Sequence, residues 1–121
     1  MTDPKAIAES YIALWNETDP AVRKQLLARY WAEGATYVDP LMAGSGTGEI
    51  ETLIEGVQQR FPNFSFNLIG KPDGYGDRVR FSWSLGPGDY VEAPIEGTDF
   101  AVLKDGRIAS VTGFLDKVPP M

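Results

Sequence analysis

The chain has 121 residues, of which 43% are hydrophobic and 23% charged, fractions typical of an ordinary folded domain. Its 17 acidic and 11 basic side chains give a formal charge of −6, which disfavours binding to nucleic acids and to anionic membrane surfaces. Because cysteine and histidine are both absent, disulfides, thiolate or histidine catalysis and histidine-ligated zinc are excluded. Acid–base chemistry must therefore use Asp, Glu, Tyr, Lys or water.

We expect one domain over residues 1–121, a length near the commonest domain size. Residues 1–5 do not resemble a signal peptide, because no basic segment is followed by a long apolar run. No stretch approaches the roughly 18 apolar residues of a membrane-spanning helix. The expected location is the cytoplasm, and we expect no cofactor and no metal.

Two helices are predicted first. Asp3 followed by Pro4 is a typical helix start, and so is Asp19 followed by Pro20. Apolar residues recur at helical spacing after each start. In the first helix they are Ile7, Tyr11, Leu14 and Trp15, and in the second, which runs to about Trp31, they are Val22, Leu26 and Tyr30.

A short strand over residues 35–38 is predicted next, and Asp39 with Pro40 ends it because a residue before proline avoids the helical conformation. Residues 41–48 contain three glycines, which indicates a mobile loop. A third helix is expected from about Glu49 to Arg60, ending at Phe61 and Pro62.

From residue 64 on, apolar residues recur at every second position, which predicts strands over residues 64–69, 78–85, 90–103 and 107–118. Turn signals separate them at residues 73–74, 86–89 and 104–106, so an antiparallel sheet follows. Pro94 and Gly97 indicate a bend or bulge in the third of these strands. The expected fold is α+β, with helices on a curved antiparallel sheet that encloses a pocket.

The order of elements resembles the cone-shaped nuclear transport factor 2-like superfamily, which includes ketosteroid isomerases and SnoaL-like polyketide cyclases. The resemblance covers nearly the whole chain and rests on residues 10–15, 35–40 and 98–108. These segments identify the superfamily and not a reaction, because fold does not fix function. The resemblance also implies a homodimer, packed through an outward sheet face that carries Phe100 and Val102.

Ketosteroid isomerases offer the sharpest comparison, because in their mechanism two carboxyl groups are tuned to different roles. The resemblance implies that Asp39 is the base, with Tyr11 and Asp99 as hydrogen-bond donors to the oxyanion. This sequence departs from the family pattern in two ways. The second helix offers Tyr30 one residue out of register with the isomerase tyrosines, and the missing histidine excludes the histidine-based mechanisms of related cyclases and dehydratases.

Each candidate has a structural alternative. Asp39 at the rim of an apolar cavity would lose hydration and accept a proton, or it could simply cap the turn after its strand. Asp99 alternates with Thr98 and Phe100, so it would face either the cavity as a neutral acid or the solvent. Tyr11 could donate to a ligand oxygen or only pack in the core.

The pocket wall is expected to consist of aromatic side chains: Trp15, Trp31, Phe61, Phe81 and Trp83. The leading hypothesis is a cofactor-independent enzyme that moves a proton in a small hydrophobic carbonyl compound through an enolate. One alternative is a binding protein that holds a small apolar ligand unchanged. Another is a water-activating enzyme similar to limonene epoxide hydrolase, with Arg80 between Asp99 and Asp116.

Overall fold

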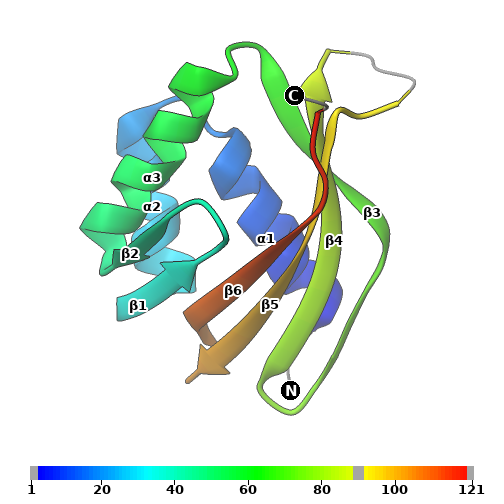
Figure 1. Ribbon diagram of the computed structural model, residues 1–121. Helices are drawn as coiled ribbons and strands as arrows, with labels where there is room; N and C mark the ends of the chain where they lie inside the picture. Colours follow the sequence, from blue (N-terminus) through cyan, green and yellow to red (C-terminus); the bar gives the residue numbers. More distant parts are fainter. Residues whose placement is uncertain (1–2, 89–91, 120–121) are drawn as a thin grey trace.

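The computed structural model describes residues 3–88 and 92–119. Three helices lie on one side of a strongly twisted, open sheet of six strands (Figure 1). The elements in chain order are α1 (Pro4–Asn16), α2 (Pro20–Tyr30), β1 (Trp31–Val38), β2 (Ala43–Ser45), α3 (Thr47–Arg60), β3 (Phe64–Tyr75), β4 (Arg78–Pro87), β5 (Ile95–Lys104) and β6 (Arg107–Lys117). The predicted α+β class, with helices on a curved sheet, is confirmed.

The two predicted helix starts are confirmed. Asp3 accepts hydrogen bonds from the backbone N–H groups of the first turn of α1, and Asp19 does the same for α2. The α2 helix ends at Tyr30, and Trp31 begins β1, so the predicted end at Trp31 is one residue late. None of the described helices has the length and apolar character needed to cross a membrane.

The sheet order is β2-β1-β6-β5-β4-β3. The predicted antiparallel meander of β3 to β6 is confirmed, whereas the parallel pairing of β1 with β6 was not predicted. The glycine-rich segment forms the short strand β2 against β1, in place of the expected loop. The third helix begins at Thr47, two residues before the predicted start.

Two turn predictions have different outcomes. The hairpin between β5 and β6 turns at Asp105 and Gly106, both with positive φ, as the sequence predicts. The turn predicted at residues 73–74 is wrong, because those residues lie within β3 and the chain reverses after Tyr75, where Gly76 has a φ of 54°. Asp89 of the second turn signal, and Tyr90 and Val91 of the predicted third strand, lie outside the described residues.

The inner face of the sheet and the helices enclose the core. Along β5 every second residue is buried, which places Asp99 on the inner face with Gly97 and Ala101 and decides between the two orientations that the alternation left open. The expected irregularity in this strand is a register shift between Glu96 and Gly97. The α1 helix packs on β3 and β4 (Figure 1), so one stripe of its side chains meets the centre of the sheet.

Candidate functional site

Four polar side chains, which we call the polar cluster, meet on the inner side of the sheet: the buried Tyr11, Tyr37 and Asp99, and the half-buried Asp39. They come from α1, from β1, from the residue directly after β1, and from β5. The strand β6 brings the last two elements together, because it pairs with β1 on one side and with β5 on the other. The structure therefore brings together the three residues predicted as catalytic and adds Tyr37 to them.

Asp39 is held by three hydrogen bonds. Its Oδ1 accepts from the backbone N–H of Leu41 at 2.8 Å and of Met42 at 2.9 Å, which is the turn-capping role considered from the sequence. Its Oδ2 accepts from the Tyr37 hydroxyl at 2.7 Å. Since Oδ1 has two donors and Oδ2 has one, Oδ2 retains more capacity to accept a further hydrogen bond.

Asp99 is 1% exposed, and neither of its oxygens has a hydrogen bond of normal geometry among the described residues. Burial raises the pKa of Asp99 to about 6, while the nearby Tyr11 hydroxyl and Trp83 indole N–H partly offset this effect. The charge of Asp39 raises the pKa further. Asp99 is therefore a buried acid that exchanges its proton near neutral pH.

The two tyrosines stay protonated. Burial raises the pKa of Tyr11 well above its ordinary value, and Asp99 and Tyr37 add to this effect. Burial, Asp99 and Asp39 raise the pKa of Tyr37 in the same direction. Both hydroxyls are therefore neutral donors at physiological pH, suited to a carboxylate or a ligand oxygen.

The buried position of Asp99 predicts how the stability of the fold depends on pH. Its folded-state pKa of about 6 exceeds the ordinary 3.8, so the folded protein binds more protons between these values and stability falls as pH rises through them. The difference corresponds to about 3 kcal/mol. Urea unfolding of Asp99→Asn and the wild type should show the variant gaining about that much relative stability between pH ~4 and ~7. A constant difference across this range would contradict the buried position of the acid.

Gly113 on β6 is the point on which the polar cluster converges. A Cβ atom there would lie 2.8 Å from Asp99 Oδ1, 3.2 Å from Asp39 Cβ and 3.6 Å from the Tyr37 hydroxyl oxygen. The first distance is shorter than real Cβ contacts, so only glycine lets the two carboxyl groups approach each other here.

Replacing Gly113 with Ala is expected to cost about 1–3 kcal/mol of stability by overpacking. In an Asp99→Ala background the cost should shrink, because the oxygen that the new methyl group meets has been removed. Urea unfolding of the four proteins measures this coupling. Gly34→Ala is a matched control, since a Cβ at Gly34 has no neighbour within 4 Å. An equal cost in both backgrounds would show that Gly113 acts independently of Asp99.

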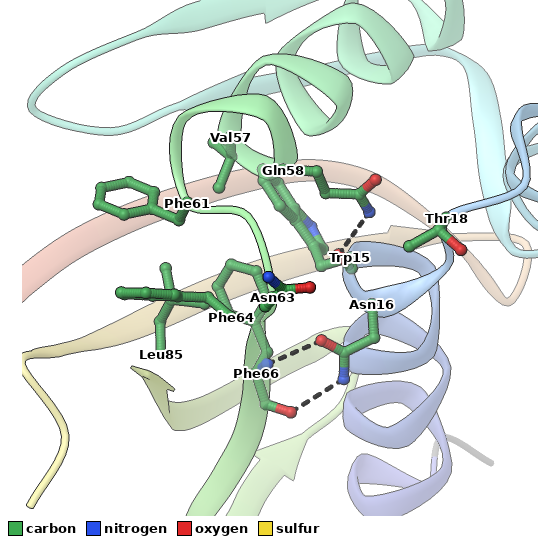
Figure 2. Close-up of a pocket in the computed structure, with 10 residues that line it drawn as sticks. All are labelled: Trp15, Asn16, Thr18, Val57, Gln58, Phe61, Asn63, Phe64, Phe66 and Leu85. Atoms are coloured by element: carbon green, nitrogen blue, oxygen red, sulfur yellow. Dashed lines mark hydrogen bonds between the residues drawn. The ribbon is translucent and has the colours of Figure 1, made fainter. Parts of the chain in front are cut away.

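A cavity of about 140 Å³ opens between the C-terminal ends of α1 and α3 and the strands β3 and β4 (Figure 2). Its described lining is Trp15, Asn16, Thr18, Val57, Gln58, Phe61, Asn63, Phe64, Phe66 and Leu85. Of the five aromatic residues predicted to form the pocket wall, Trp15 and Phe61 lie in this lining. Trp31, Phe81 and Trp83 are buried in the core instead.

Those three residues surround the polar cluster. Trp31 stacks on Tyr11 with ring centroids 5.9 Å apart, and Phe81 meets the same tyrosine edge-on at 4.8 Å. The Trp83 indole lies against Gly97, where a Cβ would overlap the ring. These side chains give the polar cluster its apolar surroundings.

A second buried network supports the cavity wall and was missed by the sequence analysis. Arg23 is 2% exposed and pairs with Glu51 at 2.8 Å. It also donates to the Glu17 carbonyl and to Gln58 Oε1. Gln58 in turn donates to the main-chain carbonyl of Trp15 (Figure 2). The network ties all three helices together beside the cavity.

The face predicted for α2 is therefore only partly correct. Val22, Leu26 and Tyr30 are half-buried, whereas Arg23 and Leu27 are the fully buried residues. Arginine is seldom fully buried unless it is paired. The Arg23 partners Glu51 and Gln58 lie 28 and 35 residues further along the chain, so their proximity had no local signal.

The three residues of the epoxide hydrolase-like alternative lie on opposite faces of the sheet. Asp99 is buried on the inner face, whereas the Arg80 side chain is 66% exposed and faces Asp73 at 3.5 Å. Asp116 is exposed and accepts a hydrogen bond from Thr98, a residue of outward parity. Because Arg80 and Asp116 do not reach Asp99, the geometry does not assemble that site.

Tyr37 is the member of the polar cluster that the sequence analysis did not single out. The sequence pattern predicts only that it belongs to the strand over residues 35–38. The available signal was its parity, because residues 35, 37 and 39 share one face of an extended chain, which places Tyr37 beside the candidate base. The burial of Ala35 and Tyr37 in β1 agrees with this pattern.

The family model of the SnoaL-like domain matches residues 8–111 of this chain. A search of curated proteins found no match to this chain. A crystal structure of a candidate isomerase of the SnoaL-like family from Agrobacterium tumefaciens str. C58 has 46% sequence identity and a TM-score of 0.89, with 96% of this chain and 99% of that chain covered.

Two further crystal structures share the fold at lower identity. A candidate ketosteroid isomerase from Kribbella flavida DSM 17836 is 22% identical with a TM-score of 0.71, and the match covers 98% of this chain and 82% of that one. A protein with a ketosteroid isomerase-like fold from Catenulispora acidiphila DSM 44928 was solved in complex with trimethylamine. It is 22% identical with a TM-score of 0.72, and the match covers 93% of this chain and 85% of that one.

Proposed function

Because the chain belongs to the SnoaL-like family, we propose that it moves a proton between carbon atoms of a small carbonyl compound without a cofactor. The observation that carries the proposal is the polar cluster itself. A half-buried carboxylate held by three hydrogen bonds lies beside a buried acid and two neutral phenols. This combination supplies a base and oxyanion donors within one site.

In the proposed reaction the carbonyl oxygen binds beside Asp99 and Tyr11. Asp39 Oδ2 takes a proton from the carbon next to the carbonyl, and the C–H electron pair moves into an enolate. The negative charge that develops on oxygen disfavours ionisation of Asp99, so the acid keeps its proton and donates to that oxygen. Asp39 then returns the proton to another carbon of the conjugated system, which restores the carbonyl group and the free carboxylate.

The test uses a β,γ-unsaturated cyclohexenone, and its conversion to the conjugated isomer is followed by ultraviolet absorbance. We expect turnover well above the rate in buffer at the same pH. If calorimetry shows that the ketone binds but the conversion is no faster than in buffer, the proposal is wrong.

A second candidate is binding of a small amine without turnover. Asp99 has no cationic partner among the described residues, and aromatic rings surround it. An ammonium ion gains from both a carboxylate and ring faces. The structural neighbour from Catenulispora was solved with trimethylamine. The two candidates need opposite protonation states of Asp99.

Calorimetric titration distinguishes the two candidates. Because the pKa of Asp99 is about 6, amine binding should strengthen as pH rises through that value. Binding of a carbonyl or phenol oxygen, which needs the protonated acid, should weaken. Trimethylamine and phenol, titrated into the wild type and Asp99→Asn on both sides of this pH, are suitable probes.

We also propose that the chain forms a homodimer through the outward face of the sheet. Phe100 and Val102 on β5 are half-buried there, and Phe114 on β6 is 57% exposed. Burying such side chains would stabilise an association. Sedimentation of the wild type and of Phe114→Asp tests this, and a wild type that is monomeric at micromolar concentration would reject it.

A further inference from the structure

Trp15 stands between the cavity and the polar cluster. It is one of the residues that line the cavity, whereas Tyr11, Tyr37, Asp39 and Asp99 are not among the described lining residues. On its inner side the Trp15 ring lies 5.5 Å from the Tyr37 ring and 5.9 Å from the Tyr11 ring, centroid to centroid. The indole therefore separates a ligand in the cavity from the polar cluster.

The main chain of Trp15 is fixed, but its indole is not tied by a hydrogen bond. The carbonyl oxygen accepts from Gln58 Nε2 at 2.9 Å (Figure 2). The indole Nε1 is buried without a hydrogen-bond partner among the described residues. Burying an unmet donor is unfavourable, so a movement that satisfies it, or a ligand oxygen that accepts from it, lowers the free energy.

The volume of the cavity beside the indole limits the size of the ligand that can occupy it. Its volume of about 140 Å³ is close to the ~150 Å³ of an engineered cavity that binds benzene. Pockets for drug-sized ligands start at about 300 Å³. The space beside Trp15 therefore suits one ring and not a fused four-ring system.

We propose that Trp15 is a gate that admits single-ring carbonyl compounds to the polar cluster and excludes larger ones. The inference rests on the proposed function and adds the size class of the substrate and the residue that sets it. When a small ligand passes, the indole moves aside from the polar cluster, and its N–H becomes available to the ligand oxygen.

The test compares kcat/KM for the β,γ-unsaturated cyclohexenone with that for a β,γ-unsaturated ketosteroid. The wild type should prefer the small ketone. Trp15→Ala should shift the ratio toward the steroid by at least about tenfold, the scale of a single steric contact in a pocket. Trp15→Leu, a milder change, should shift it in the same direction.

Tyr75→Leu is the control, because Tyr75 is 79% exposed at the end of β3 and is not among the described residues that line the cavity. This variant removes an aromatic ring without changing the cavity or the gate, so its ratio should stay near that of the wild type. An unchanged ratio in folded Trp15→Ala and Trp15→Leu would overturn the proposal, as would a wild type that turns over the steroid as well as the small ketone.

A binding measurement separates failure of the gate from failure of the proposed function. Phenol and β-naphthol are titrated into the wild type, Trp15→Ala and Asp99→Asn by calorimetry. The gate predicts that β-naphthol gains affinity at least about tenfold more than phenol does in Trp15→Ala. It also predicts that the gain is lost when Asp99→Asn is added. Equal effects on both phenols would reject the gate, whether or not any ketone is isomerised.

Discussion

Replacing Asp39 with Asn is expected to lower kcat for the β,γ-unsaturated cyclohexenone by at least about 100-fold, the usual contribution of a general base. Asn keeps the size of the side chain, and its oxygen can still accept from the turn backbone at Leu41 and Met42. It cannot accept a proton from carbon. KM should change little, because the groups proposed to bind the carbonyl oxygen are Tyr11 and Asp99.

The matched control is Asp73→Asn, which removes one carboxylate from an exposed position on β3 and leaves the net charge equal to that of Asp39→Asn. It should retain wild-type kcat. If Asp39→Asn also retains it, the base lies elsewhere, and if both variants lose activity, the net charge matters and not the position. Circular dichroism and the unfolding midpoint establish that both variants are folded.

Replacing Arg23 with Met is expected to destabilise the protein by about 3–5 kcal/mol, the cost of breaking a buried ion pair by removing one partner. Glu51, whose side chain is 13% exposed, loses its counter-ion, and the Glu17 carbonyl loses a donor. Urea unfolding measures the loss. The wall of the cavity should loosen as well, because Gln58 joins Arg23 to Trp15.

Arg29→Met is the control on the same helix. Arg29 is exposed and lies over the Tyr30 ring at 5.2 Å, so its loss should cost no more than about 1 kcal/mol. Adding Glu51→Leu to Arg23→Met should recover part of the stability, since replacing both charges leaves no unpaired ion. A cost of Arg23→Met as small as that of Arg29→Met would show that the network does not hold the helices.

Local patterns predicted most of the fold. The period-two alternation along β5 separated the face of Asp99 from that of Thr98 and Phe100, although only the structure shows that it is the inner one, and turn residues located the hairpin at Asp105 and Gly106. Errors arose where two local signals competed. The Asp73–Gly74 pair looked like a hairpin turn, but the chain reverses at Gly76, whose positive φ suits the turn equally well.

Long-range pairing was beyond local patterns. The parallel contact of β1 with β6 joins segments more than 70 residues apart, for example Val38 with Thr112, and nothing in either segment specifies the other. That contact brings Asp39 to Gly113 and thus to Asp99. The three candidate residues were gathered from a resemblance, whereas Tyr37 and Arg23 needed the tertiary structure because their partners decide their roles.

The most direct measurement of the central claim is exchange of the α-hydrogens of cyclohexanone in deuterium oxide, followed by proton NMR. This ketone cannot isomerise, so exchange reports enolate formation alone and does not depend on the natural substrate. The wild type should accelerate exchange well beyond buffer at matched pH, and Asp39→Asn should abolish the acceleration. Exchange at the buffer rate, with the ketone bound, would contradict proton transfer at the polar cluster.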